Sequence, residues 1–222
     1  LQLIDEFIET QTTKDGELVI EVTPHEIFDT VALLNVDAAY IKFEILDNGE
    51  VWVDETHSLA DVEVRDWWEY YFTEPKVKKE HIFTGFPATR VSSIRITLIP
   101  RGEDGRTAIG KLIVGKYEEL GCARWGAEIT LLNFSKIGRN DFGHITVIPR
   151  SSAKEAKFDV RIDTENTTYV MDILERIKDT PCLWVGEESY GLTAIYGIYD
   201  GYRTILRNRR FSSGVLYIKG FV

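Results

Sequence analysis

The stretch Tyr40-Ile-Lys-Phe-Glu-Ile-Leu-Asp-Asn-Gly-Glu-Val-Trp-Val53 carries the clearest fold signal in the chain. Its side chains alternate in character, so Ile41, Phe43 and Ile45 fall on one face of a strand. The turn-forming residues Asp47-Asn48-Gly49 separate that strand from a second one at residues 51–53. The stretch therefore predicts an antiparallel hairpin with one buried face.

The same two-residue period continues on both sides of this hairpin. Residues 18–22 and 94–98 show it within the first half of the chain, and a further strand is predicted at residues 108–114 after a turn at residues 101–105. Short strands separated by frequent turns, without a convincing helix, are typical of all-β domains. We predict a jelly-roll-like antiparallel β-sandwich over residues 15–118, preceded by a lead-in segment at residues 1–14.

Residues 119–222 combine strand patterns with one amphipathic helix. A helix is predicted over Thr167–Lys178, with Asn166 as its N-cap, because four apolar side chains recur there at helical spacing: Val170, Ile173, Leu174 and Ile177. Strand patterns occur at 128–134, 144–148, 158–162, 183–185, 192–199, 202–206 and 215–221. We predict an α+β domain with one helix on an antiparallel sheet, so the fold is mainly β.

The charge is divided at the same place as these patterns. The 222 residues contain 26 Lys and Arg and 36 Asp and Glu, a net charge of −10. Residues 1–118 hold 23 acidic and 12 basic residues (net −11), whereas residues 119–222 hold 13 and 14 (net +1). Such acidity argues against a nucleic-acid partner and against an anionic membrane surface. No apolar segment reaches the ~18 residues of a spanning helix, so no membrane insertion is expected.

Cysteine and histidine usage predicts neither a metal site nor a cofactor. Cys122 and Cys182 are too few for a disulfide framework and lack metal-ligand spacing. We expect two buried free thiols, with a single bridge between them as the alternative. The four histidines lie far apart in sequence and show no zinc-site spacing: His25, His57, His81 and His144.

Several short motifs have ordinary structural interpretations. Asp141-Phe-Gly143 is predicted to form a hairpin turn, because no other nucleotide-binding motif accompanies it. Asn133-Phe-Ser135 and Asn166-Thr-Thr168 are glycosylation sequons only in a secretory context. Asp66 and Glu69 would suit a glycosidase pair, but neighbouring carboxylates in an acidic domain usually form a solvated face. No catalytic residue is therefore assigned.

The most distinctive segment is Asp66-Trp-Trp-Glu-Tyr-Tyr-Phe-Thr73. As a strand it would bury Trp68, Tyr70 and Phe72 in the core. The other face would then carry Trp67, Glu69 and Tyr71, two aromatic rings around a carboxylate that could stack on a sugar and bind its hydroxyls. The alternative is that these side chains pack against a loop, the second domain or another subunit.

The one basic concentration of the chain follows three tyrosines near the C-terminus. It comprises Arg203, Arg207, Arg209 and Arg210. Aromatic and basic residues together are found in single-stranded nucleic-acid sites. We expect instead a subunit contact with an acidic surface, such as the first domain of another copy.

Four segments in order resemble a family of tail or baseplate proteins of tailed bacteriophages and prophages. They are Asp66–Thr73; Ile109-Gly-Lys-Leu-Ile-Val-Gly115 with Leu120-Gly121; Asn133-Phe-Ser-Lys136 with Asp141-Phe-Gly143; and a closing set of Thr180-Pro181, Trp184-Val-Gly186, Tyr196-Gly-Ile-Tyr199 and Leu216-Tyr-Ile-Lys-Gly220. Tyr217 and Lys219 replace acidic residues usual in that family. The resemblance covers most of residues 15–222.

This resemblance implies a virion component whose first domain is similar to jelly-roll carbohydrate-binding modules, with no catalytic residues. The expected function is a non-enzymatic structural protein of the tail or baseplate, assembled in the host cytoplasm and present in several copies. Its partners would be other tail proteins and copies of itself. The alternative is a glycan-binding module for host surface carbohydrate, and a third possibility is a glycoside hydrolase.

Overall fold

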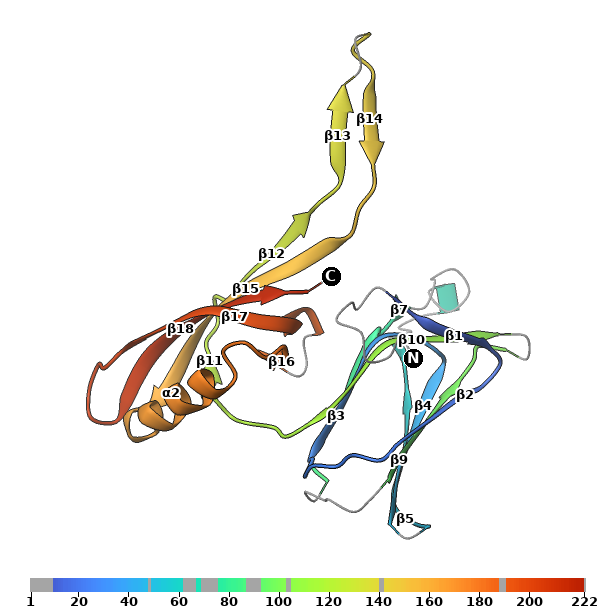
Figure 1. The fold of residues 1–222 in the computed structure, drawn as a ribbon, viewed down its shortest axis with the longest axis horizontal. Helices are drawn as coiled ribbons and strands as arrows, with labels where there is room; N and C mark the ends of the chain where they lie inside the picture. The colour runs from blue at the N-terminus through green and yellow to red at the C-terminus, as the bar shows by residue number, and fades with distance from the viewer. Residues whose placement is uncertain are drawn as a thin grey trace. The chain divides into compact units, whose positions relative to one another are not determined.

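The computed structural model describes residues 10–47, 49–61, 67–68, 76–86, 93–102, 105–139, 142–187 and 191–221. The chain divides into two compact units, Leu1–Tyr117 and Glu118–Val222. Both consist mainly of antiparallel sheets, which confirms the predicted β-rich fold (Figure 1). Among the described residues, no helix is long and apolar enough to cross a membrane.

The first unit contains two four-stranded antiparallel sheets. The first sheet has the order β1 (Thr12–Asp15), β10 (Arg106–Gly115), β3 (Thr30–Asp37) and β8 (Glu80–Phe83). The second has the order β2 (Leu18–Val22), β9 (Ser93–Ile99), β4 (Tyr40–Asp47) and β5 (Glu50–Ser58). The short strands β6 (Ala60–Asp61) and β7 (Lys76–Val77) pair with each other. Strand β1 begins within the segment expected to be a lead-in.

One apolar core joins the two sheets of the first unit. Ile41, Phe43 and Ile45 of β4 are at most 1% exposed, as their alternation predicted. Phe43 stacks on Phe83 of β8 with a centroid separation of 4.4 Å. Because β4 and β8 belong to different sheets, this aromatic pair lies in the core that both sheets share.

The hairpin predicted from the opening stretch is present as β4 and β5. Asp47 pairs with Glu50, so the connection is the two-residue turn that the Asn-Gly dipeptide indicates. Gly49 has a φ of +90°, which a side chain would strain, while Asn48 lies outside the described residues. A register shift, the mark of a β-bulge, occurs between Ile45 and Leu46.

The second unit is a single antiparallel sheet with a long two-stranded extension. Its order is β11 (Cys122–Ala123), β15 (Ser152–Asp163), β18 (Phe211–Gly220), β17 (Ala194–Ile205) and β16 (Cys182–Val185). Strand β12 (Glu128–Asn133) also pairs with β15, and β13 (Lys136–Arg139) pairs with β14 (Ile145–Ile148). The patterns at 192–199 and 202–206 belong to one strand, β17, with a register shift at Tyr199–Gly201.

Helix α2 (Thr167–Arg176) packs its apolar stripe into the core of the second unit. Val170, Ile173 and Leu174 are buried as predicted, and the Leu174 carbonyl accepts a hydrogen bond of 2.7 Å from the hydroxyl of Tyr199. The prediction that Asn166 caps the helix with its side chain is wrong. Asn166 closes the 3₁₀ turn η2 (Thr164–Asn166) in a helical conformation, and its side chain makes no cap hydrogen bond. A second 3₁₀ turn, η3 (Gly191–Thr193), precedes β17.

Candidate functional site

The β13–β14 pair forms an exposed arm on the second unit. Every residue of both strands is exposed, and Figure 1 shows the pair continuing beyond the sheet that contains β12 and β15. We call residues Lys136–Ile148 the β-arm. Its connection includes Phe142 and Gly143, with Gly143 at a φ of +82°, which confirms the hairpin prediction for this segment. Asp141 lies outside the described residues.

The β-arm presents apolar side chains to solvent. Ile137 pairs with Val147 and Arg139 pairs with Ile145, and alternation along a strand places these two pairs on one face. The exposed fractions are 70% for Ile137, 56% for Val147 and 63% for Ile145. An isolated two-stranded hairpin is at best marginally stable in water. Contiguous exposed apolar groups are typical of interaction surfaces.

A hydrogen-bonded joint connects the β-arm to the sheet. The Asn133 side chain accepts a hydrogen bond of 2.9 Å from the backbone N–H of Ser135, forming a local Asx turn. The Ser135 hydroxyl accepts a hydrogen bond of 3.1 Å from the backbone N–H of Arg150. Phe134 N–H donates across the same joint to the Ser151 carbonyl at 3.3 Å. The sequence Asn133-Phe-Ser135, noted above as a sequon, therefore has a structural role in setting the direction of the β-arm.

The arginine cluster begins with Arg203 in strand β17 and continues into the connection between β17 and β18. All four of its side chains, Arg203, Arg207, Arg209 and Arg210, belong to exposed residues. The Asn208 side chain organises the loop by accepting hydrogen bonds from the backbone N–H groups of Arg210 (2.8 Å) and Phe211 (2.9 Å). Arg161 stacks over the ring of Phe211 at 4.7 Å. The exposed arginines at this end of the sheet have an acidic neighbour, because the exposed Asp163 of β15 pairs with Phe211.

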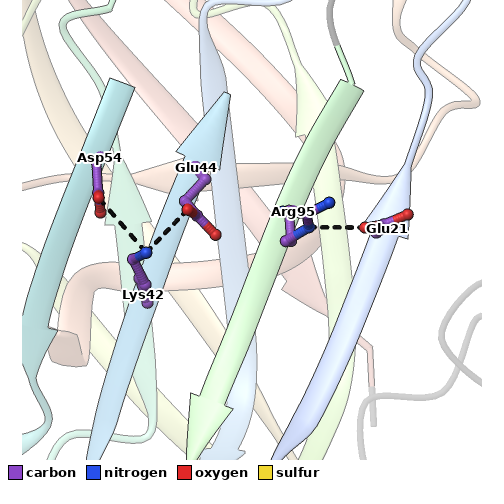
Figure 2. Close-up of polar contacts among 5 residues, drawn as sticks. All are labelled: Glu21, Lys42, Glu44, Asp54 and Arg95. Atoms are coloured by element: carbon purple, nitrogen blue, oxygen red, sulfur yellow. Dashed lines mark hydrogen bonds and ion pairs between the residues drawn. The ribbon is translucent and has the colours of Figure 1, made fainter. Parts of the chain in front are cut away.

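A row of charged side chains crosses the sheet β2-β9-β4-β5 (Figure 2). Lys42 lies 2.8 Å from Glu44 and 3.4 Å from Asp54. The Arg95 side chain lies 2.7 Å from Glu21. The hydrogen bond to Glu44 raises the pKa of Lys42 above its ordinary value. These contacts satisfy the charges within the sheet, and they explain how Glu44 is buried on the face that the sequence pattern assigned to solvent.

The structure describes only part of the proposed sugar-binding segment. Trp67 and Trp68 are 79% and 71% exposed and lie in a helical turn. The prediction of a strand that buries Trp68 is therefore wrong at these two residues. Glu69 and Tyr71, the other proposed sugar contacts, lie outside the described residues, as do Asp66, Tyr70 and Phe72.

Two histidines that are distant in sequence meet at one side of the first unit. The rings of His57 on β5 and His81 on β8 are 4.6 Å apart, and both contact the ring of Phe83. Burial and the neighbouring His57 lower the pKa of His81 from 6.5 to about 4. His57 lies 3.1 Å from Glu55. Sequence spacing cannot reveal this pair, because it depends on which edge strands of the two sheets come together.

The cysteines do not form the alternative disulfide, since both are free thiols. Cys122 is exposed, so the expectation that both are buried is wrong for this residue. Cys182 is half-buried, and burial raises the pKa of its thiol. Within the described part of the chain, no group of three or more His, Cys, Asp or Glu side chains is arranged to hold a metal ion.

No protein-family model matches the chain, and no curated protein sequence matches it significantly.

Proposed function

We propose that the chain is a non-enzymatic structural component of a bacteriophage tail or baseplate, present in several copies in the virion. The observation that carries the proposal is the β-arm, whose apolar side chains are exposed on a two-stranded extension of the second unit. A contact of this kind between identical chains generates symmetric assemblies. The resemblance of four sequence segments to tail proteins supplies the biological setting.

The strand order of the first unit supports a finer fold class, the jelly roll. The sheets are ordered β1-β10-β3-β8 and β2-β9-β4-β5, so the earliest strands pair with the latest and successive strands alternate between sheets up to β4. This is the arrangement expected of eight strands folded as two Greek keys. A jelly-roll first unit agrees with the family resemblance.

Sedimentation velocity of the purified chain tests the assembly role. The expected result is concentration-dependent self-association that a chain lacking residues 136–148 does not show. The biological setting is tested by immunogold labelling of phage particles released from the strain that encodes the chain. Absence of label on mature, intact particles would refute a role in the virion.

A second candidate function is recognition of host surface carbohydrate by the first unit. The observation that favours it is the exposure of Trp67 and Trp68, since exposed aromatic rings provide stacking surfaces for sugars. A host polysaccharide panel tests it by titration calorimetry, with Trp67→Ala expected to abolish binding. Trp125→Ala is the matched control, because Trp125 is 90% exposed in the second unit. Equal binding by both variants would refute a role for Trp67.

A further inference from the structure

Strand β5 is an edge strand with unusual surface chemistry. Among the described strands it pairs only with β4, so one row of its backbone N–H and C=O groups faces outward. Val51 is 49% exposed and Trp52 is 61% exposed. The strand also carries Glu50, Asp54 and Glu55, and no Lys or Arg lies within residues 50–58. Asp54 lies 3.4 Å from Lys42 of β4, and Glu55 lies 3.1 Å from His57. An edge of this kind combines an apolar patch with negative charge.

The charges on β5 restrict which strand can join it. Two identical β5 edges would bring carboxylates against carboxylates, and like charges across strands are destabilising. Charged edge residues are a common protection against such self-pairing. A strand with apolar side chains and positive charge meets no such repulsion. The edge therefore discriminates against its own copy and in favour of a basic partner.

The β-arm has the complementary chemistry. Its exposed apolar residues Ile137, Ile145 and Val147 would cover Val51 and Trp52. Residues 134–150 contain Lys136, Arg139 and Arg150 against one acidic residue, Asp141. Arg139 lies on the same face of the β-arm as Ile137, Ile145 and Val147, whereas the exposed Lys136 lies on the opposite face of β13. Charge and apolar character thus match between two elements of the same chain.

We propose that the β-arm of one copy docks along strand β5 of a second copy. This inference rests on the assembly role proposed above and assigns its contact. The two surfaces differ, so the contact is head-to-tail, and repetition closes a ring if the rotation between copies permits it. The division of charge, −11 in residues 1–118 and +1 in residues 119–222, favours the approach of the second unit of one copy to the first unit of the next.

A charge exchange tests the contact. The arm variant combines Lys136→Glu with Arg139→Glu, and the edge variant combines Glu50→Lys with Glu55→Lys. All four residues are exposed, and Glu55 lies 3.1 Å from His57, so circular dichroism checks that each variant keeps the fold. Each variant alone should self-associate at least about tenfold more weakly than the unchanged chain does. An equimolar mixture should regain assembly, because the reversed arm fits the reversed edge and the unchanged arm fits the unchanged edge.

Native mass spectrometry with one variant isotopically labelled reads the composition of the restored particles. Equal numbers of the two variants in each particle are expected. The control is Arg124→Glu with Lys178→Glu, two exposed basic residues of the second unit outside both the β-arm and the arginine cluster. It changes the charge by the same amount as the arm variant and should leave assembly intact. Hydrogen exchange should show protection at residues 50–58 and 136–148 as concentration rises.

The outcomes separate this contact from the assembly role. If the unchanged chain assembles but the arm and edge variants assemble equally well, the β5 contact is wrong while the assembly role stands. Failure of the mixture to regain assembly also refutes the contact, as does a loss of assembly that is confined to the control variant with Arg124→Glu and Lys178→Glu. If the unchanged chain remains a monomer at every concentration, the proposed assembly role itself is refuted.

Discussion

Replacing Phe43 by alanine is expected to destabilise the first unit by about 3–5 kcal/mol, the usual cost of removing a buried phenylalanine. Phe43 is 0% exposed, and its ring stacks on Phe83 with centroids 4.4 Å apart and planes 16° apart. It also contacts Phe86, with centroids 5.6 Å apart. Alanine would therefore leave a cavity at the junction of the two sheets, lined by rings that have little freedom to fill it.

A double-mutant cycle isolates the contact between the sheets. Phe43→Leu and Phe83→Leu keep most of the apolar volume but lose the stacked pair. Their coupling energy is expected to be about 0.5–1.5 kcal/mol, the value typical of aromatic pairs. A coupling energy near zero would mean that the two rings do not stabilise each other.

Urea unfolding read by hydrogen exchange and mass spectrometry measures these effects in each unit separately. Peptides from β4 and β9 report on the first unit, and peptides from β15 and β18 report on the second. The control is Tyr40→Ala on the same strand, which is 48% exposed and should change stability by about 0.5 kcal/mol or less. A cost below about 1 kcal/mol for Phe43→Ala would refute the shared core. Equal destabilisation of both units would refute their separate cores.

Three further predictions concern single side chains. The first unit should lose stability as the pH falls from 6.5 to about 4. Burial lowers the pKa of His81 in the folded state to about 4, so between these pH values the unfolded state binds a proton at His81 and the folded state does not. His81→Gln should flatten this part of a urea-unfolding pH profile. Trp184→Phe removes a 3.0 Å hydrogen bond from the buried indole to the Gly197 carbonyl and should cost about 1–3 kcal/mol of unfolding free energy in urea, whereas an unchanged midpoint would contradict the role of that bond. Ser135→Ala removes the 3.1 Å hydrogen bond that the backbone N–H of Arg150 donates to the Ser135 hydroxyl. Amide exchange should become faster in residues 136–148 and stay unchanged in β15. If residues 136–148 exchange at the same rate in the variant and the unchanged chain, the joint does not order the β-arm.

Alternation in the sequence predicted the strands whose two faces differ. Strand β4 is the clear case, since Ile41 and Phe43 are buried while Tyr40 is 48% exposed. The same rule missed β3, where Ala32, Leu33 and Leu34 are all buried. A continuous apolar run carries no alternation and does not distinguish a strand from a buried helix. The two-residue period therefore identified strands with one exposed face, such as β4, and missed a strand with consecutive buried residues, β3.

The candidate surfaces show a second limit of prediction from sequence. The β14 pattern indicated a strand, but alternation cannot say whether a second sheet will cover its apolar face, so the exposure of Ile145 and Val147 required the structure. Strand β13 was missed because Lys136-Ile-Gly-Arg139 is short and contains glycine, which weakens the strand signal. The strand predicted at Trp67 and Trp68 is wrong. The prediction followed the aromatic content of the segment, whereas the backbone of these two residues is helical in the structure.

The pairing scheme of the second unit also implies an order of folding during synthesis. Strands β12 and β15 meet at Asn133 and Ser152, and the β-arm lies between them in sequence, so this long hairpin can close as soon as residue 163 has left the ribosome. The other neighbour of β15 is β18, which pairs Phe158 with Leu216 near the end of the chain. Local pairings form much faster than distant ones because they cost less loop-closure entropy. We expect β12 to pair with β15 on the nascent chain before β18 completes the sheet.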